Sequence, residues 1–347
     1  MRVLAIGGTG FIGRFTVAAL SEFGHDVTVF HRGQTPVEKS AASVLGDRRE
    51  IAKRAAELRA VRPDVVIDFL ISNQRQAEEL IGIFRGYAAR VIMPSSCDVY
   101  RAAGILHRTE PGEPDNTLIT ELSALRTQLH PYPPEAVRAI RAVYPWLEED
   151  YDKIPAERTI LSCAELPGTI LRLPMIYGPC DPLHRFYPVI KRVDDGRGVM
   201  LLDESTAQWR AIRGYVEDVA WAVALAAGDA RAAGRVYNVG DPENFTELEW
   251  RRQIAEAAGW RGRFLVLPDD QTPAHLKARG NLRQHWAADS TCIRRELGYR
   301  ERVPHVEALR RTVDWERAHP PAQIDLAEYE YDAEDRAISA APAPASY

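Results

Sequence analysis

The sequence lacks any apolar stretch near the roughly 18 residues that a membrane-spanning helix needs, so no membrane partner is expected. Cysteine is also scarce. Cys97, Cys163, Cys180 and Cys292 are scattered and show none of the paired spacings that are typical of metal sites. The chain begins with a strand pattern instead of a signal peptide. We therefore expect reduced thiols in a cytoplasmic protein, without a metal.

An excess of positive charge is missing as well. The 347 residues carry 44 Lys and Arg against 49 Asp and Glu, which gives a formal net charge of −5. This mild acidity gives no electrostatic reason to expect a nucleic acid or a membrane surface as partner. We expect a small-molecule substrate. The oligomeric state stays open, with a homodimer as one alternative.

The sequence does contain a glycine-rich turn close to its start. A short apolar run at residues 3–6 leads into GGTGFIG at 7–13, a helical pattern then extends to Gly24, and a second strand pattern covers 27–30. This order predicts a dinucleotide-binding βαβ unit, in which the turn and the helix N-terminus hold a pyrophosphate. The candidate cofactor residues of the turn are Gly7, Thr9, Gly10, Phe11, Ile12 and Gly13.

Strand and helix patterns continue to alternate after this unit. Apolar runs at residues 65–70, 90–94 and 168–173 are typical of strands buried in parallel sheets, and helical patterns cover 48–61 and 75–84. The alternation predicts an α/β fold with a Rossmann-type, doubly wound parallel sheet. Such a sheet binds its ligands at the carboxyl ends of the strands.

The composition also suggests domain boundaries. Residues 1–180 are expected to form an NAD(P)-binding Rossmann domain, which the chain rejoins at about 209–240. Within it, residues 101–150 contain six prolines and predict an irregular insertion over the ligand edge, a candidate lid. Residues 181–208 and 241–317 are assigned to a smaller C-terminal substrate domain. Residues 318–347 are acidic and then rich in Ala and Pro, which predicts a disordered tail.

Several motifs in this order resemble those of an extended short-chain dehydrogenase/reductase of the NAD(P)-dependent epimerase/dehydratase family. GGTGFIG resembles the cofactor loop, LGD (45–47) the adenine-contact turn, and SSCDVY (95–100) the strand of the catalytic serine. LRLPMIYGP, RGYVEDVAWAVALA, RVYNVG and IRRELGYR resemble further landmarks up to about residue 317. The resemblance implies an enzyme that exchanges a hydride with a hydroxyl or carbonyl of a small or nucleotide-linked substrate, including a sugar. It does not choose between epimerase, dehydratase and reductase.

The family uses a serine or threonine, a lysine, and a tyrosine four residues before the lysine. Ser96 matches the serine and Lys153 the lysine, but Glu149 stands at the position of the tyrosine. If a helix starts near Pro155, Tyr151 and Lys153 lie on one side of an extended segment, and Tyr151 becomes the acid/base. If the helix runs through, Glu149 shares a face with Lys153 as base or ion-pair partner. The catalytic prediction is Ser96, Tyr151 and Lys153, in which Lys153 also holds the cofactor ribose and lowers the tyrosine's pKa. A Tyr151 without any catalytic role is the remaining alternative.

The resemblance assigns further binding residues. His31 and Arg32 follow the second strand, where an NAD-preferring protein usually carries an acid, so we expect NADP more than NAD. Asp47 resembles the residue that accepts a hydrogen bond from adenine. Arg213 and Met175 stand at substrate-binding positions: Arg213 suits a diphosphate, but Met175 replaces the usual asparagine. An internal salt bridge is the alternative for Arg213.

A different class of function stays open at this point. The chain could be a catalytically weak or inactive NADP-binding sensor, a regulatory protein or an RNA-associated protein of the same fold. The missing regular tyrosine favours this alternative, as does the likeness of FHRGQT (30–35) to RNA-associated relatives. The retained Ser96 and Lys153, together with the negative net charge, favour an enzyme.

Overall fold

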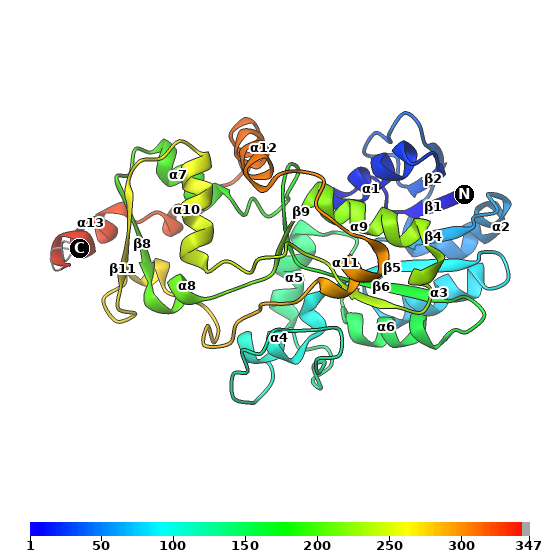
Figure 1. Ribbon diagram of the computed structural model, residues 1–347, viewed down its shortest axis with the longest axis horizontal. Helices are drawn as coiled ribbons and strands as arrows, with labels where there is room; N and C mark the ends of the chain where they lie inside the picture. Colours follow the sequence, from blue (N-terminus) through cyan, green and yellow to red (C-terminus); the bar gives the residue numbers. More distant parts are fainter. Residues whose placement is uncertain (342–347) are drawn as a thin grey trace.

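The computed structural model describes residues 1–341 and has a seven-stranded sheet with helices on both faces (Figure 1). The strands lie in the order β10-β6-β5-β4-β1-β2-β3, and every pairing in this sheet is parallel. The order runs outward from β1 in both directions, which confirms the predicted doubly wound fold. The strands are β1 (Arg2–Ile6), β2 (Asp26–His31), β3 (Ala42–Leu45), β4 (Val65–Asp68), β5 (Arg90–Ser96), β6 (Gly168–Leu173) and β10 (Val236–Asn238).

Helices α1 and α9 pack against each other on one face of this sheet, and α3 packs against α6 on the other (Figure 1). In residues 1–341 no helix is both long and apolar enough to cross a bilayer. The α-helices are α1 (Phe11–Glu22), α2 (Ala55–Ala60), α3 (Gln74–Phe84), α4 (Arg101–Leu106), α5 (Pro134–Val143), α6 (Lys153–Ser162), α7 (Tyr187–Asp194), α8 (Glu204–Gln208), α9 (Val216–Gly228), α10 (Glu247–Ala257), α11 (Thr291–Leu297), α12 (His305–Ala318) and α13 (Tyr331–Ala340). The 3-10 helices are η1 (Arg48–Arg54), η2 (Cys97–Val99), η3 (Ala230–Ala232), η4 (Ala274–Leu276) and η5 (Leu326–Glu328).

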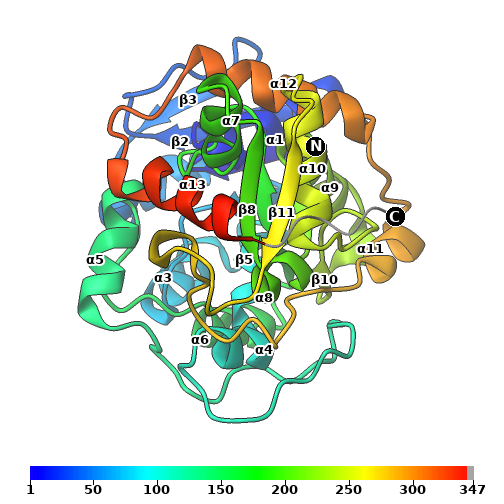
Figure 2. The ribbon, with the colours of Figure 1, turned by 90° about the vertical axis from the view of Figure 1, so that its left-hand side faces the viewer.

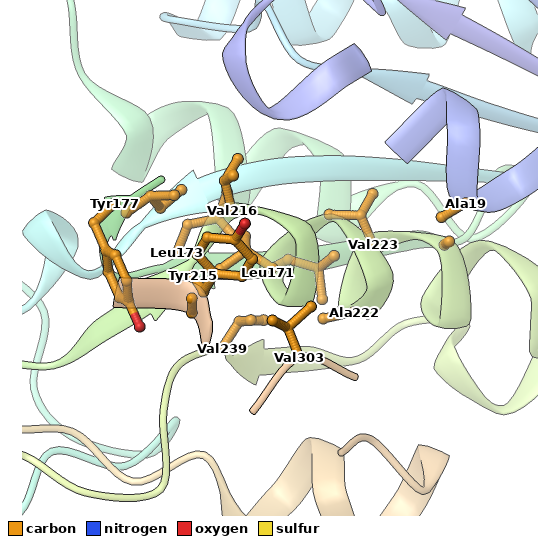
Figure 3. Packing of buried hydrophobic residues seen from close by; sticks show 14 of the residues in the cluster. Ala19, Leu171, Leu173, Tyr177, Tyr215, Val216, Ala222, Val223, Val239 and Val303 are labelled. Carbon is orange, nitrogen blue, oxygen red and sulfur yellow. The ribbon is translucent and has the colours of Figure 1, made fainter. Parts of the chain in front are cut away.

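Alternate residues of β1 belong to two separate cores. Val3 and Ala5 lie in the core that α1 and α9 share, whereas Leu4 and Ile6 lie in the core beside α3 and α6. This period of two is typical of a strand that is buried on both faces. Figure 3 shows the first core, in which small and branched side chains of α9 pack close to those of β6.

Strand β3 is a finding of the structure that the sequence analysis did not predict. Its side chains are mostly exposed, and only Val44 is half-buried. An edge strand of this kind has no continuous apolar run, so periodicity does not mark it. It pairs with β2 alone and leads directly to Asp47.

A second group of elements lies to one side of the central sheet (Figures 1 and 2). It contains the parallel pair β8 (Val199–Asp203) and β11 (Arg263–Leu267), with α10 packed on α7, α8 and α12. Another parallel pair, β7 (Met175–Tyr177) and β9 (Arg213–Tyr215), stands apart from both sheets. Most of the second group comes from the residues that the sequence analysis assigns to the substrate domain.

The prediction of a disordered tail from residue 318 is wrong for its described part. Tyr331–Ala340 form helix α13, which packs beside β8 of the small sheet (Figure 2). Its Glu334 is fully buried, accepts a hydrogen bond from Arg192 at 2.8 Å and contacts the His275 ring at 3.1 Å. An acidic composition favours disorder in an isolated segment. Here, cationic side chains of the folded protein pair with the acidic side chains of the tail. Residues 342–347 of the predicted tail lie outside the described residues.

The buried pair of Glu334 and Arg192 predicts that the tail contributes to stability. Glu334→Ala leaves the buried Arg192 guanidinium without its acid, and removing one member of a buried pair costs about 3–5 kcal/mol. We therefore expect a clearly lower melting temperature in thermal unfolding followed by circular dichroism. Asp332→Ala, an exposed change on the same helix, is the control and should melt like the wild type. Equal midpoints for both variants would contradict the prediction.

Candidate active site

A cavity of about 750 Å³ lies at the carboxyl edge of the central sheet. Because parallel strands end at the same edge, segments that are distant in sequence meet around it. The lining comes from the loops after β1 to β6 and from the insertion at residues 101–150. It includes every cofactor and catalytic residue predicted from the sequence: Gly7, Thr9, Gly10, Phe11, Ile12, Gly13, His31, Arg32, Asp47, Ser96, Tyr151 and Lys153.

The glycine turn between β1 and α1 has the shape that a pyrophosphate requires. Gly7 has a φ of +80°, in the left-handed region that favours glycine. A Cβ atom on Gly13 would lie 2.6 Å from the Gly7 carbonyl oxygen, so the close approach of helix to strand requires glycine. A Cβ atom on Gly10 would meet one neighbour at 3.6 Å, so the space beside Gly10 is open. No side chain caps α1, which leaves the N–H groups of its first turn to an anion.

Residues after β2 and β3 define what would be the adenosine end of the cavity. Arg32 is exposed, and within residues 1–341 its guanidinium has no hydrogen-bond or ion-pair partner. His31 is buried and its ring contacts Ser43 Oγ at 3.2 Å. Asp47 caps η1, since its Oδ1 accepts the Arg49 N–H at 2.9 Å. The glycine turn and these side chains together fit a dinucleotide.

Lys153 is the first residue of α6, and its ammonium bridges two chain segments. Asp152 caps the helix by accepting the Ile154 N–H at 2.9 Å. The Nζ of Lys153 donates to the Ile71 carbonyl and to the Pro94 carbonyl, the latter at 3.3 Å. Burial lowers the pKa of Lys153 to about 8, against the attraction of two carboxylates. The side chain is therefore held in place and still mostly charged at neutral pH.

The start of α6 separates the two alternatives for the acid/base. The helix begins at Lys153, two residues before the expected Pro155, so the preceding residues lie outside it. The side chain of Glu149 is 84% exposed, pairs with Arg141 at 2.7 Å and does not line the cavity. The alternative in which Glu149 acts beside Lys153 is therefore wrong. Tyr151 does line the cavity and remains the candidate.

The ionisation of Tyr151 differs from the prediction. The sequence analysis expects Lys153 to lower the tyrosine's pKa, whereas in the structure burial raises the pKa of Tyr151. The carboxylate of Asp98 adds to this rise. Within the described residues, the Tyr151 hydroxyl has no hydrogen-bond partner. It is thus a neutral proton donor that faces no protein acceptor.

Two consecutive serines at the end of β5 have different roles. Ser96 Oγ accepts the Asp98 N–H at 3.1 Å, so the proton of its hydroxyl remains for a ligand. Ser95 Oγ donates instead to Glu157 of α6 at 2.5 Å. Glu157 also pairs with Arg172 of β6 at 2.7 Å. The buried serine thus helps to anchor α6 to the sheet, and Ser96 faces the cavity.

The two predicted substrate residues do not line the cavity, which corrects that prediction. Arg213 is buried, pairs with Glu247 and has its guanidinium 4.7 Å from the ring centre of Trp250. This is the internal salt bridge that stood as the alternative. Met175 lies on β7 between two residues that do line the cavity, and strand alternation directs it to the other side.

The structure adds four ring-bearing side chains in a row, only one of them predicted. We call His107, Tyr132, Tyr151 and Trp286 the aromatic wall, and all four line the cavity. Ring centroids are 6.2 Å apart for Tyr132 and Tyr151, 6.4 Å for His107 and Tyr132, and 6.3 Å for His107 and Trp286. His107 and Tyr132 come from the proline-rich insertion. No periodic pattern marks them, and the prolines are the only signal of an unusual segment there.

The end of the insertion lies beside the cofactor end of the same cavity. The Trp146 ring centre is 5.7 Å from Lys153 Nζ. Arg49, beside Asp47, donates to the Pro145 carbonyl at 2.7 Å and pairs with Glu148 at 3.1 Å. Five neighbouring side chains of this segment line the cavity: Ile140, Val143, Tyr144, Trp146 and Leu147.

Comparison with known proteins places this site in a family. The family model described as "NAD dependent epimerase/dehydratase family" matches residues 3–102 and 148–240, more than half of the chain. The chain is 25% identical to a chloroplast stem-loop binding protein of 41 kDa from Arabidopsis thaliana, over 89% of this chain and 77% of that protein. It is also 25% identical to a dTDP-glucose 4,6-dehydratase from Streptomyces niveus, over 91% of this chain and 93% of that protein.

Solved structures share the fold. A UDP-glucose 4-epimerase from Stenotrophomonas maltophila, with bound NAD and formylated UDP-arabinopyranose, superposes with a TM-score of 0.66 at 18% identity, covering 92% of this chain and 98% of that one. The UDP-glucose 4-epimerase of Thermus thermophilus in complex with NAD gives 0.61 at 23% identity, covering 92% and 100%. The matched segments contain the glycine turn, Ser96 and Lys153. The chain is therefore an enzyme of the NAD-dependent epimerase/dehydratase family.

Proposed function

We propose that this enzyme reduces a carbonyl, or oxidises the corresponding hydroxyl, of a small substrate, with Tyr151 as the acid/base. One observation carries the proposal: a single cavity brings the glycine turn, Ser96, Tyr151 and Lys153 together although they are far apart in sequence. The family assignment supports hydride chemistry over the alternative of an inactive sensor or an RNA-associated protein.

Each side chain has a role that follows from its surroundings. A bound nicotinamide cofactor supplies or takes up the hydride. Lys153 holds the ribose with its ammonium, and Ser96 donates its hydroxyl proton to the substrate oxygen. Tyr151 transfers its proton to that oxygen as the carbonyl becomes a hydroxyl. Because burial raises the pKa of Tyr151, the residue starts neutral, which favours the reductive direction.

We also propose that NADP is preferred over NAD. The support is Arg32, an exposed guanidinium at the adenosine end that has no partner among the described residues. The residues that end and follow β2 include no acid for a ribose hydroxyl. A guanidinium there suits the 2′-phosphate, which it can bind with two parallel hydrogen bonds.

We retain the domain division as part of this proposal. Residues 1–180, rejoined at 209–240, form the cofactor domain, and residues 181–208 and 241–317 form the substrate domain. The cavity supports it, since Leu183, Arg185 and Trp286 line it together with the glycine turn. The cytoplasmic location also remains a proposal, supported by the four free cysteines.

The glycine turn gives a direct test of cofactor binding. Gly10→Val should abolish nucleotide binding and leave the fold intact, because its side chain would enter the open space that the pyrophosphate needs. Calorimetric titration with NADPH and NADH measures this. Gly82→Val is the matched control: Gly82 also has open space around its Cβ position, but it does not line the cavity. Unchanged affinity of Gly10→Val for both cofactors would contradict the assignment of the glycine turn as the pyrophosphate site.

The preference for NADP depends on Arg32. The wild type should bind NADPH more tightly than NADH, and Arg32→Ala should lose about ten- to a hundredfold in NADPH affinity, as expected for one charge-assisted contact. Its NADH affinity should hardly change. Arg300→Ala, an exposed arginine that does not line the cavity, is the control. The role of Arg32 in binding the 2′-phosphate is refuted if the wild type prefers NADH, or if Arg32→Ala still prefers NADPH.

The misplaced tyrosine can be tested once a substrate is found by screening carbonyl compounds for oxidation of NADPH. Tyr151→Phe should spare cofactor affinity and lower turnover by the ~10²–10⁴-fold typical of a lost general acid. Lys153→Ala should impair both cofactor binding and turnover. Glu149→Gln is the control, because Glu149 is exposed and outside the cavity. Full activity in Tyr151→Phe removes the tyrosine from the mechanism.

A further inference from the structure

We propose that the substrate is an uncharged, ring-bearing alcohol or ketone, selected by the aromatic wall, and not a nucleotide-linked sugar. This inference rests on the proposed function and adds the substrate class. Three observations support it: the pairing of the charged side chains that line the cavity, the volume of the cavity, and the position of most wall residues outside the segments that the family model matches.

A nucleotide-linked substrate brings a diphosphate, which cationic side chains bind most strongly when they are free to pair with it. Three of the arginines that line the cavity are already paired with acids. Arg48 pairs with Asp68 at 2.8 Å, Arg49 with Glu148 at 3.1 Å, and Arg185 with Asp181 at 2.6 Å. These guanidiniums are neutralised by the protein itself.

The two cavity arginines without an acid partner within residues 1–341 are Arg14 and Arg32. Arg14 directly follows Gly13 on α1 and already donates to Cys180 Sγ at 3.1 Å and to the Thr9 carbonyl at 3.4 Å. Arg32 follows β2, at the adenosine end. The ammonium of Lys153 is bound to two carbonyl groups. Among the described residues that line the cavity, no free cation therefore lies beside Ser96 and the aromatic wall.

The charges around the aromatic wall point the same way. Asp98 also lines the cavity and accepts a hydrogen bond from the Tyr132 hydroxyl. Burial lowers the pKa of His107, so this ring is neutral at pH 7. The Asp98 carboxylate also pairs with the buried Arg126 at 3.5 Å. The wall thus presents uncharged rings and an acid that the protein itself neutralises, so it offers no positive charge to an anion. Arg213, the residue expected to grip a diphosphate, is buried against Glu247.

Size gives an independent restriction. A cavity of about 750 Å³ falls within the roughly 300–1,000 Å³ that is usual for one drug-sized ligand. A dinucleotide along the glycine turn takes up much of this volume. The space beside Ser96 and the aromatic wall is only a part of this cavity, which favours a small ring over a second nucleotide.

The wall is also a feature of this chain beyond the family pattern. The family model matches residues 3–102 and 148–240, and it leaves out the segment 103–147 between them. His107 and Tyr132 come from that segment. Trp286 also lies outside the matched residues. The glycine turn is therefore built from matched residues, while three of the four wall residues come from parts of the chain that the family model does not match. Substrate choice can change in such a segment without loss of the cofactor site.

Calorimetry on the NADPH-loaded protein tests the inference with 1-phenylethanol and UDP-glucose as probes. Both are alcohols, so reduced cofactor prevents turnover. We expect 1-phenylethanol to bind at least about tenfold more tightly than UDP-glucose, because its ring packs on the wall and it carries no phosphate to desolvate. Tighter binding of UDP-glucose, or no binding of 1-phenylethanol, overturns the inference. NADPH binding is measured first by nicotinamide fluorescence: its absence would refute the proposed function, whereas its presence with UDP-glucose preferred refutes only the substrate class.

Variants of the aromatic wall test whether its side chains determine which substrate binds. Trp286→Ala and His107→Ala should each weaken 1-phenylethanol binding by about three- to tenfold, the usual worth of an aromatic contact, and leave NADPH affinity unchanged. His107 as a whole residue is more exposed than Trp286, although its ring is desolvated within the wall, so its variant keeps the test valid if Trp286→Ala does not fold. Trp221→Ala is the matched control, since Trp221 stacks on Phe23 away from the cavity. Wild-type affinity for 1-phenylethanol in the wall variants would contradict the proposal.

Discussion

The buried ion pair between Arg172 of β6 and Glu157 of α6 positions the candidate active site. The two side chains are 5% and 2% exposed and 2.7 Å apart, and Ser95 of β5 donates to the same carboxylate. Loss of either partner would leave an uncompensated buried charge, which is strongly unfavourable. Lys153 lies one helical turn before Glu157 on the same face, so fixing Glu157 directs the Lys153 ammonium to the strand ends.

Burial acts on both titratable groups of the proposed mechanism in the same sense, toward the neutral form. It lowers the pKa of Lys153 to about 8 and raises the pKa of Tyr151. The insertion contributes to this burial, since the Trp146 ring lies beside the ammonium and Tyr132 lies beside Tyr151. A proton donor that starts neutral and a lysine that keeps its charge at neutral pH are compatible with carbonyl reduction. In the proposed mechanism the sheet and the glycine turn provide the cofactor site, and the insertion sets the environment of the proton transfer.

The proposed substrate class is compatible with the family fold because the cofactor end and the aromatic wall depend on different parts of the chain. The cofactor end depends on backbone geometry at Gly7, Gly10 and Gly13, which tolerates little change. The substrate end depends on side chains of loops, which can change without disturbing the sheet. In this chain the arginine at a usual substrate position, Arg213, has become part of the packing with Glu247 and Trp250.

Local patterns in the sequence predicted the sheet and the glycine turn, because glycine geometry and strand periodicity depend on near neighbours. Edge strand β3 escaped notice for the same reason, since it is mostly exposed and has no such pattern. Ser96 and Lys153 were predicted from the resemblance to a family, and the structure places both at the cavity. Tyr151 and Glu149 could not be distinguished from sequence, because the answer depends on where Asp152 caps α6. Arg213, the aromatic wall and helix α13 depend on partners far away in the chain, such as Glu334 with Arg192. Only the tertiary structure brings these partners together, since burial and ion pairing are set by distance in space and not by distance along the sequence.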